Sequence, residues 1–148
     1  MADYTERISE IMYPLVYKNA DSFSAATYTT DYASLAGYHR AWCYINVGDM
    51  QENATLDVAL YQATDTSGTS AKAITSKSIT QLTQASGDGD DLLCIELQTE
   101  ELDVDNGFDC VAVRVVVGTA AVELGLTLFG CMPRYAPTAT ANWAEIVT

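Results

Sequence analysis

The sequence predicts an all-β fold: a single-domain antiparallel β-sandwich, jelly-roll-like, with an N-terminal arm and an extended C-terminal tail. Along most of the chain hydrophobic residues recur with a period of two, which places them on one face of a strand. Runs rich in glycine and aspartate separate these segments, at NVGDMQEN, TDTSGTS, ASGDGDD and DVDNGFD. Many short strands between such turns are typical of sandwiches and related barrels.

About six to eight strands are expected between residues 23 and 132. Four runs alternate clearly between apolar and polar positions: TLDVALYQA, LLCIELQTEE, CVAVRVVVG and VELGLTLFG. The run HRAWCYINVGD is apolar on both faces, with Trp42 and Tyr44 opposite Ile45 and Val47. Such a strand is either central in its sheet or covered by a neighbouring chain. The segments SFSAATYTTDYASL and SAKAITSKSITQLT also suit strands, because Thr and Tyr favour them.

One domain is expected, since the 148 residues contain no internal repeat and no linker. The sandwich is assigned to residues 23–132, between an N-terminal arm or short helix over 1–22 and a tail over 133–148. Apolar residues in the arm have partly helical spacing, which Pro14 interrupts. The arm therefore either packs on its own sandwich or reaches a neighbouring subunit. Apolar residues in the tail are also expected to dock, in the same chain or another.

The charge excludes several classes of partner. With 20 acids against 7 bases, the net charge is −13, which repels nucleic acids and anionic membranes. No apolar run approaches the length of a membrane-spanning helix. The N-terminus lacks the basic and apolar regions of a signal peptide, so synthesis and folding in a cytoplasm are expected.

The four cysteines predict no metal site. Cys43, Cys94, Cys110 and Cys131 are widely spaced, and His39 is the only histidine. Each cysteine lies in a strand-like run, so buried free thiols are favoured over disulfides. Disulfides remain open for a protein that is released from the cell.

The stretch EELDVDNGFD, residues 100–109, invites comparison with a calcium loop. An EF-hand register from Glu101 puts Asn106 where glycine is required and Ala112 where the last glutamate is required. A hairpin with an Asn-Gly turn fits better. The surrounding acids predict a solvated acidic edge. Two alternatives stay open: a weak Ca²⁺ or Mg²⁺ site between Asp88–Asp91 and Asp103–Asp109, or an acidic patch that meets a basic partner.

No catalytic residue, metal ligand or cofactor is assigned, and the chain is not expected to be an enzyme. No nucleophile, phosphate-binding or dinucleotide-binding motif is present in the sequence. A triad would have to use His39, which stands at the start of a strand and is expected at the surface.

As a whole the chain resembles the capsid decoration, or cement, proteins of tailed bacteriophages. The resemblance lies in DYASLAGYHRAWCYINVGDM, ATLDVALYQATDTSGTSAKAITSKSITQLT and DDLLCIELQTEELDVDNGFDCVAVRVVVG, which cover most of residues 31–118. It implies a non-enzymatic virion structural protein on the capsid exterior, made in the host cytoplasm. It also implies the major capsid protein as partner, a homo-oligomer, commonly a trimer, and stabilisation of the shell. No site residue carries over from the family.

The contacts with the capsid or between subunits are assigned from the residues themselves, because tyrosine is enriched at interfaces and both ends carry apolar residues. The assigned residues are Tyr4, Ile8, Ile11, Met12, Tyr13, Tyr17, Trp143, Ile146 and Val147. Other virion components, namely a head fibre, a head–tail joining protein or a tail-tube protein, are alternatives. A carbohydrate-binding module is the alternative from another class, since Tyr and Trp also stack on sugars.

Overall fold

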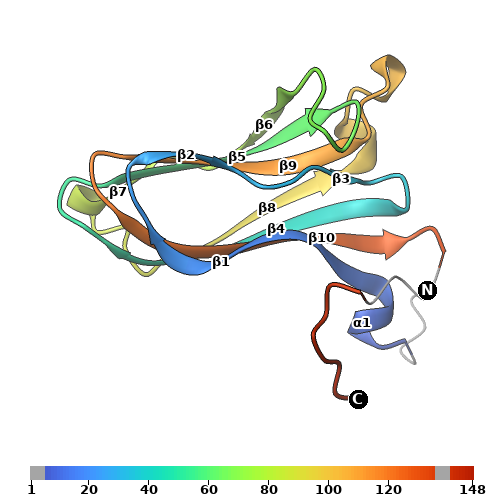
Figure 1. Ribbon diagram of the computed structural model, residues 1–148, viewed down its shortest axis with the longest axis horizontal. Helices are drawn as coiled ribbons and strands as arrows, with labels where there is room; N and C mark the ends of the chain where they lie inside the picture. The colour runs from blue at the N-terminus through green and yellow to red at the C-terminus, as the bar shows by residue number, and fades with distance from the viewer. Residues whose placement is uncertain (1–5, 136–140) are drawn as a thin grey trace.

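Two antiparallel sheets face each other in the computed structural model, which describes residues 6–135 and 141–148 (Figure 1). The first sheet has the order β1 (Met12–Phe23), β10 (Val122–Pro133), β4 (Tyr38–Met50) and β8 (Leu92–Gln98). The second has the order β2 (Ala26–Thr29), β9 (Cys110–Gly118), β5 (Thr55–Ala63) and β6 (Lys72–Ser78). Two short strands extend it: β3 (Ala33–Ser34) beside β9 and β7 (Leu82–Thr83) beside β5.

The strand order is that of a jelly roll. Along the chain, the eight longer strands are β1, β2, β4, β5, β6, β8, β9 and β10. The first, eighth, third and sixth of these form one sheet, and the second, seventh, fourth and fifth form the other. Two interlocked Greek keys give this order. The predicted all-β, jelly-roll-like sandwich is therefore confirmed, and β4 lies centrally in its sheet, as its two apolar faces predicted.

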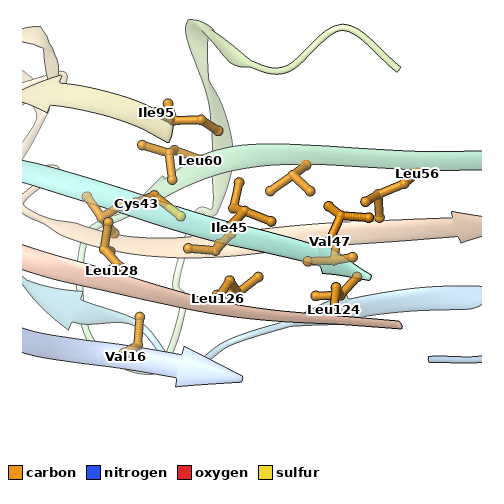
Figure 2. Close-up of a cluster of buried hydrophobic side chains, with 14 of the residues drawn as sticks. Val16, Cys43, Ile45, Val47, Leu56, Leu60, Ile95, Leu124, Leu126 and Leu128 are labelled. Atoms are coloured by element: carbon orange, nitrogen blue, oxygen red, sulfur yellow. The ribbon is translucent and has the colours of Figure 1, made fainter. Parts of the chain in front are cut away.

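The core fills the space between the sheets with aliphatic side chains from alternate strand positions (Figure 2). Ile45 on β4 pairs with Leu126 on β10, and both are almost fully buried. Val58 on β5, which pairs with Val115 in the second sheet, is buried in the same core cluster. Burial of about 25 cal/mol per Å² of apolar surface makes this layer the main source of stability.

The sandwich begins earlier than the sequence indicated, at Met12 and not at residue 23. The second half of the arm expected over residues 1–22 is the edge strand β1, and α1 (Ile8–Ile11) is the helical part among residues 6–22. The register of β1 shifts between Pro14 and Val16 and again between Lys18 and Asp21. These irregularities interrupt the period of two, and Pro14 is tolerated because the strand lies at an edge.

The acidic stretch over residues 100–109 is not a hairpin, so that prediction is wrong. It connects β8 in one sheet to β9 in the other through two short 3₁₀ turns, η2 (Thr99–Glu101) and η3 (Val104–Asn106). Gly107 ends the second turn with φ 81°, a left-handed conformation that glycine adopts without strain. Buried Leu102 and Phe108 anchor the connection.

All four cysteines are free thiols, but they are not all buried. Cys43 and Cys110 are buried, whereas Cys131 is half-buried and Cys94 is exposed. The prediction of buried thiols is wrong for Cys94, because its strand position points away from the core. None of the helices in the described parts of the chain is long and apolar enough to cross a membrane.

Replacing Leu126 with alanine tests the core. We expect the free energy of unfolding to fall by about 2–5 kcal/mol, because a buried Leu→Ala change leaves a cavity. Thr127→Ala, one residue along on the outer face of β10, is the matched control and is expected to cost about 0.5 kcal/mol or less. Denaturant unfolding measures both values, and equal losses would contradict the assignment of the inner face.

Candidate contact surface

Residues 141–148 of the tail meet the beginning of strand β1 (Figure 1). The side-chain Nδ2 of Asn142 donates hydrogen bonds to the carbonyl oxygens of Pro14 (2.8 Å) and Leu15 (3.4 Å). The backbone N–H of Asn142 donates to the hydroxyl oxygen of Tyr13 at 3.1 Å. The tail therefore covers backbone acceptors at the register shift of an edge strand.

An aromatic cluster lies on the outer face of the four-stranded sheet, at the same end as the tail. The rings of Trp42 and Phe129 stack, with centroids 5.6 Å apart, because these residues pair directly across β4 and β10. Tyr44 lies 5.8 Å from Trp42, and Trp143 of the tail lies 6.4 Å from Phe129. Trp143 is thus packed on its own chain, and its indole Nε1 is buried with no hydrogen-bond partner among the described residues.

The residues assigned to contacts differ widely in exposure. Exposed fractions are 69% for Ile8, 51% for Tyr17, 38% for Ile146 and 87% for Val147. Ile11, Met12 and Trp143 are half-buried, and Tyr13 is buried at 8%. Tyr4 lies outside the described residues. Tyr13 accepts a hydrogen bond from Asn142 of the tail, and Trp143 is the next residue of that tail, so the structure brings these residues from two distant parts of the chain together.

Sequence reasoning missed two residues that shape this region, Asn142 and Phe129. Phe129 is at an outward position of a regular alternating run, so the period of two contained the signal. Nothing in the sequence marked Asn142, because its partners stand more than a hundred positions earlier in the chain.

A mixed polar and apolar groove adjoins the aromatic cluster. Its volume is about 430 Å³. It opens on the outer face, where β4 begins and where β8 and β10 end. Its lining includes Met12, Arg40, Trp42, Lys77, Glu96, Gln98, Glu101, Cys131 and Met132. Charged residues from both sheets therefore border an apolar, aromatic surface.

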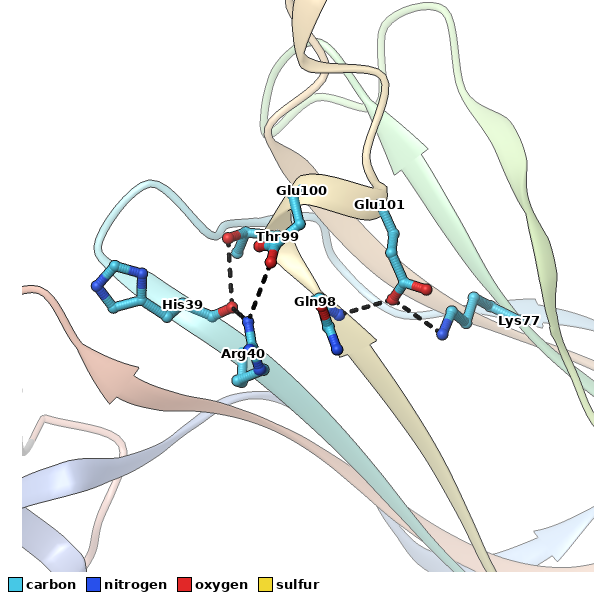
Figure 3. Close-up of polar contacts among 7 residues, drawn as sticks. All are labelled: His39, Arg40, Lys77, Gln98, Thr99, Glu100 and Glu101. Atoms are coloured by element: carbon cyan, nitrogen blue, oxygen red, sulfur yellow. Dashed lines mark hydrogen bonds and ion pairs between the residues drawn. The ribbon is translucent and has the colours of Figure 1, made fainter. Parts of the chain in front are cut away.

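Ion pairs fix the polar rim of this groove (Figure 3). Arg40 lies 3.5 Å from Glu100, and Lys77 lies 2.9 Å from Glu101. Lys77 Nζ also donates to the carbonyl oxygen of Glu96 at 2.9 Å, which ties β6 to the outer edge of β8. The hydrogen bond from the backbone N–H of Gln98 and then the contact with Lys77 lower the pKa of Glu101, so its carboxylate is held ionised.

The two acidic loops lie too far apart to form one metal site. Asp88–Asp91 precede β8 and Asp103–Asp109 follow it, so the whole strand, about 23 Å in length, separates them (Figure 1). The alternative of a joint Ca²⁺ or Mg²⁺ site is therefore wrong. Asp88 instead accepts a hydrogen bond from the backbone N–H of Thr83, and Asp103 is paired with Lys72. Over residues 6–135 and 141–148, no three potential ligands cluster as a metal site requires.

His39 is exposed at the beginning of β4, as the sequence predicted. Its carbonyl oxygen accepts hydrogen bonds from Arg40 and Thr99, so its backbone has a local structural role (Figure 3).

No protein-family model and no curated protein matches the chain. Solved structures from infectious bursal disease virus are similar to it over much of its length. The structure of the Gx strain is 12% identical with a TM-score of 0.43, covering 85% of this chain and 34% of that chain. The VP2 subviral particle is 12% identical with a TM-score of 0.34, covering 82% and 30%. This chain thus spans about a third of the length of those chains, and similarity at this level defines no function for it.

Asn142→Ala tests how the tail is held. Loss of the two side-chain hydrogen bonds to β1 should release the tail and speed amide hydrogen exchange around Trp143 several-fold, since each such bond contributes about 0.5–1.5 kcal/mol. Glu145→Gln, an exposed change in the same tail, is the control. Unchanged exchange in the alanine variant would show that aromatic packing alone holds the tail.

Glu101→Gln tests the rim through its pH dependence. Because the folded-state pKa of Glu101 is lowered, its stabilising effect is present above the unfolded-state pKa and is lost as pH falls through the folded-state pKa. The variant should be less stable than the wild type at about pH 7, and the difference should shrink as pH falls below the unfolded-state pKa of about 4.3. Thermal unfolding across this range measures it, with exposed Glu123→Gln as control. A difference that persists in acid would contradict the ion-pair explanation.

Proposed function

We propose that this protein is a non-enzymatic virion structural protein that binds the outer surface of a tailed-bacteriophage capsid and stabilises the shell. The observation that carries the proposal is the gathering of both chain ends, with exposed apolar side chains, at one end of the sandwich. Ile8 on one segment and Val147 on the other expose most of their surface there. A well-packed sandwich that presents apolar side chains at one end suits a subunit that docks on a lattice.

In the proposed mechanism, the shell is stabilised by many copies of the protein bound at equivalent positions. Each copy buries a modest interface across a seam between subunits of the major capsid protein, its proposed partner. Many copies then reinforce many seams, so the shell gains stability although each contact is small. We propose a trimer at three-fold positions, because three copies around one axis place their contact ends on adjacent seams.

The net charge of −13 supports a position on the capsid exterior. Strong negative charge keeps crowded copies soluble and disfavours contact with packaged nucleic acid. The proposal assigns no catalytic residue and no cofactor, and the charged groups described at the groove rim serve as structural ion pairs.

A carbohydrate-binding module is the second candidate, and the outward ring of Trp42 is the observation that favours it. Jelly rolls form lectin domains as well as capsid proteins, so the fold does not separate the two functions. Binding to a glycan array would support this candidate, whereas co-sedimentation with empty capsids would support the first.

Point substitutions test capsid binding better than removal of the N-terminal residues, because residues 12–17 belong to β1. Ile8→Asp combined with Val147→Asp should reduce the number of copies per particle at least several-fold, since each change buries a charge at the proposed contact. Cryo-electron microscopy of particles incubated with each variant measures occupancy.

Leu92→Asp is the matched control for this experiment. Leu92 is also exposed, at 64%, but stands at the opposite end of β8. Full occupancy of the double variant, or an equal loss in the control, would contradict the proposed contact end.

A further inference from the structure

One carboxylate in the groove beside Trp42 has no partner. The other charged side chains at this rim are neutralised in pairs, Arg40 with Glu100 and Lys77 with Glu101. Glu96 is exposed, and its side chain makes no hydrogen bond or ion pair with the described residues. The groove therefore presents one uncompensated negative charge.

Trp42 lies next to this charge. Trp42 on β4 and Glu96 on β8 are direct cross-strand partners on the outer face, a relation that places their Cβ atoms about 4.5–5.5 Å apart. Phe129 stacks on the Trp42 ring from the β10 side, and the indole N–H of Trp42 donates to Cys94 on β8. The ring is held by both contacts before any ligand arrives.

The negative charge of Glu96 also affects Cys131, another residue that lines the groove. Burial raises the pKa of Cys131 to about 11, and the negative charge of Glu96 is the second cause. Cys131 on β10 lines the same groove as Glu96 on β8.

Two flexible apolar side chains border the same groove, Met12 and Met132. Met132 is 63% exposed, and its φ of 52° is a conformation that non-glycine residues rarely adopt. Strained backbone of this kind is found where a side chain must be presented in one direction. Methionine adapts its shape to an incoming aliphatic stem.

We propose that this groove receives an arginine side chain of the protein's binding partner, with the guanidinium over Trp42 and paired with Glu96. This inference rests on the proposed function in one respect: the partner that supplies the arginine is the capsid surface. The aliphatic stem of the arginine lies between Met12 and Met132, and the planar head uses both the aromatic face and the carboxylate.

The charge and shape of the groove favour arginine over three other candidate ligands: a neutral saccharide, an apolar side chain and lysine. A neutral saccharide can stack on Trp42 but leaves the charge of Glu96 without a counterion. A purely apolar side chain would desolvate that carboxylate at a cost. Lysine matches the charge, but its ammonium group lacks the planar face and the bidentate donors of a guanidinium. The net charge of −13 further attracts a basic partner.

The test uses the full chain and small probes. Nα-acetyl-arginine amide is titrated into ¹⁵N-labelled protein, and the Trp42 indole N–H signal is followed by NMR. We expect saturable millimolar binding that weakens at least fivefold in Glu96→Gln, an isosteric change that removes the charge. Glu123→Gln, also exposed on the outer face of this sheet, should bind like the wild type.

Three results with the amino-acid probes would overturn the inference. They are equal binding of Nα-acetyl-citrulline amide, which is isosteric but neutral; equal binding of Nα-acetyl-norleucine amide; and unchanged arginine binding by Glu96→Gln. Preferential binding of methyl glycosides over the arginine probe would also overturn it and would favour the carbohydrate module.

Particle binding separates this inference from the proposed function. If the arginine probe binds through Glu96 but the wild-type protein does not bind capsids, the proposed function fails and the groove assignment stands. If the wild-type protein binds capsids but not the arginine probe, the groove assignment is wrong and the proposed function stands. Reduced occupancy of Glu96→Gln on particles, with Glu123→Gln unaffected, would support both.

Discussion

The interaction on which this structure depends is the burial of aliphatic side chains between two sheets. The central strands β4 and β10 give alternate side chains to that layer, among them Ile45 and Leu126. Because neighbouring positions point the opposite way, the same strands must display a second set of residues outside. Trp42 and Phe129 are in that outer set. The contact surface is therefore a consequence of how the core is built.

The sequence was sufficient for the strands that keep a strict period of two, and insufficient where that period breaks. β5 alternates between buried and half-buried positions from Thr55 to Gln62 and was predicted within its observed limits. β1 was missed because two register shifts and Pro14 disturb its pattern. The Asn-Gly pair after Asp105 lies in a turn, as predicted, but the hairpin was wrong, since turn chemistry is local and sheet membership is not.

The sequence predicted which kinds of residue form the candidate site, but it did not predict how they lie relative to one another. Apolar residues at both ends were visible in the sequence, but their proximity depends on Asn142 reaching the bulge near Pro14. The groove depends in the same way on strand register, because Trp42 and Glu96 become neighbours only when β4 and β8 pair. A single sequence contains neither register nor tail path, so long-range pairs of this kind become visible only in three dimensions.

The edges of the four-stranded sheet explain why partner recognition falls to side chains. An open edge invites another strand to pair with it, which leads to uncontrolled association. Here Asn142 occupies carbonyl oxygens of the β1 edge, and Lys77 occupies the carbonyl oxygen of Glu96 on the β8 edge. Part of each edge is thus occupied by the chain's own side chains, which supports recognition through the outer face and the end where the tail docks. Side-chain contacts of that kind are individually weak and specific, which suits a subunit whose effect comes from many copies.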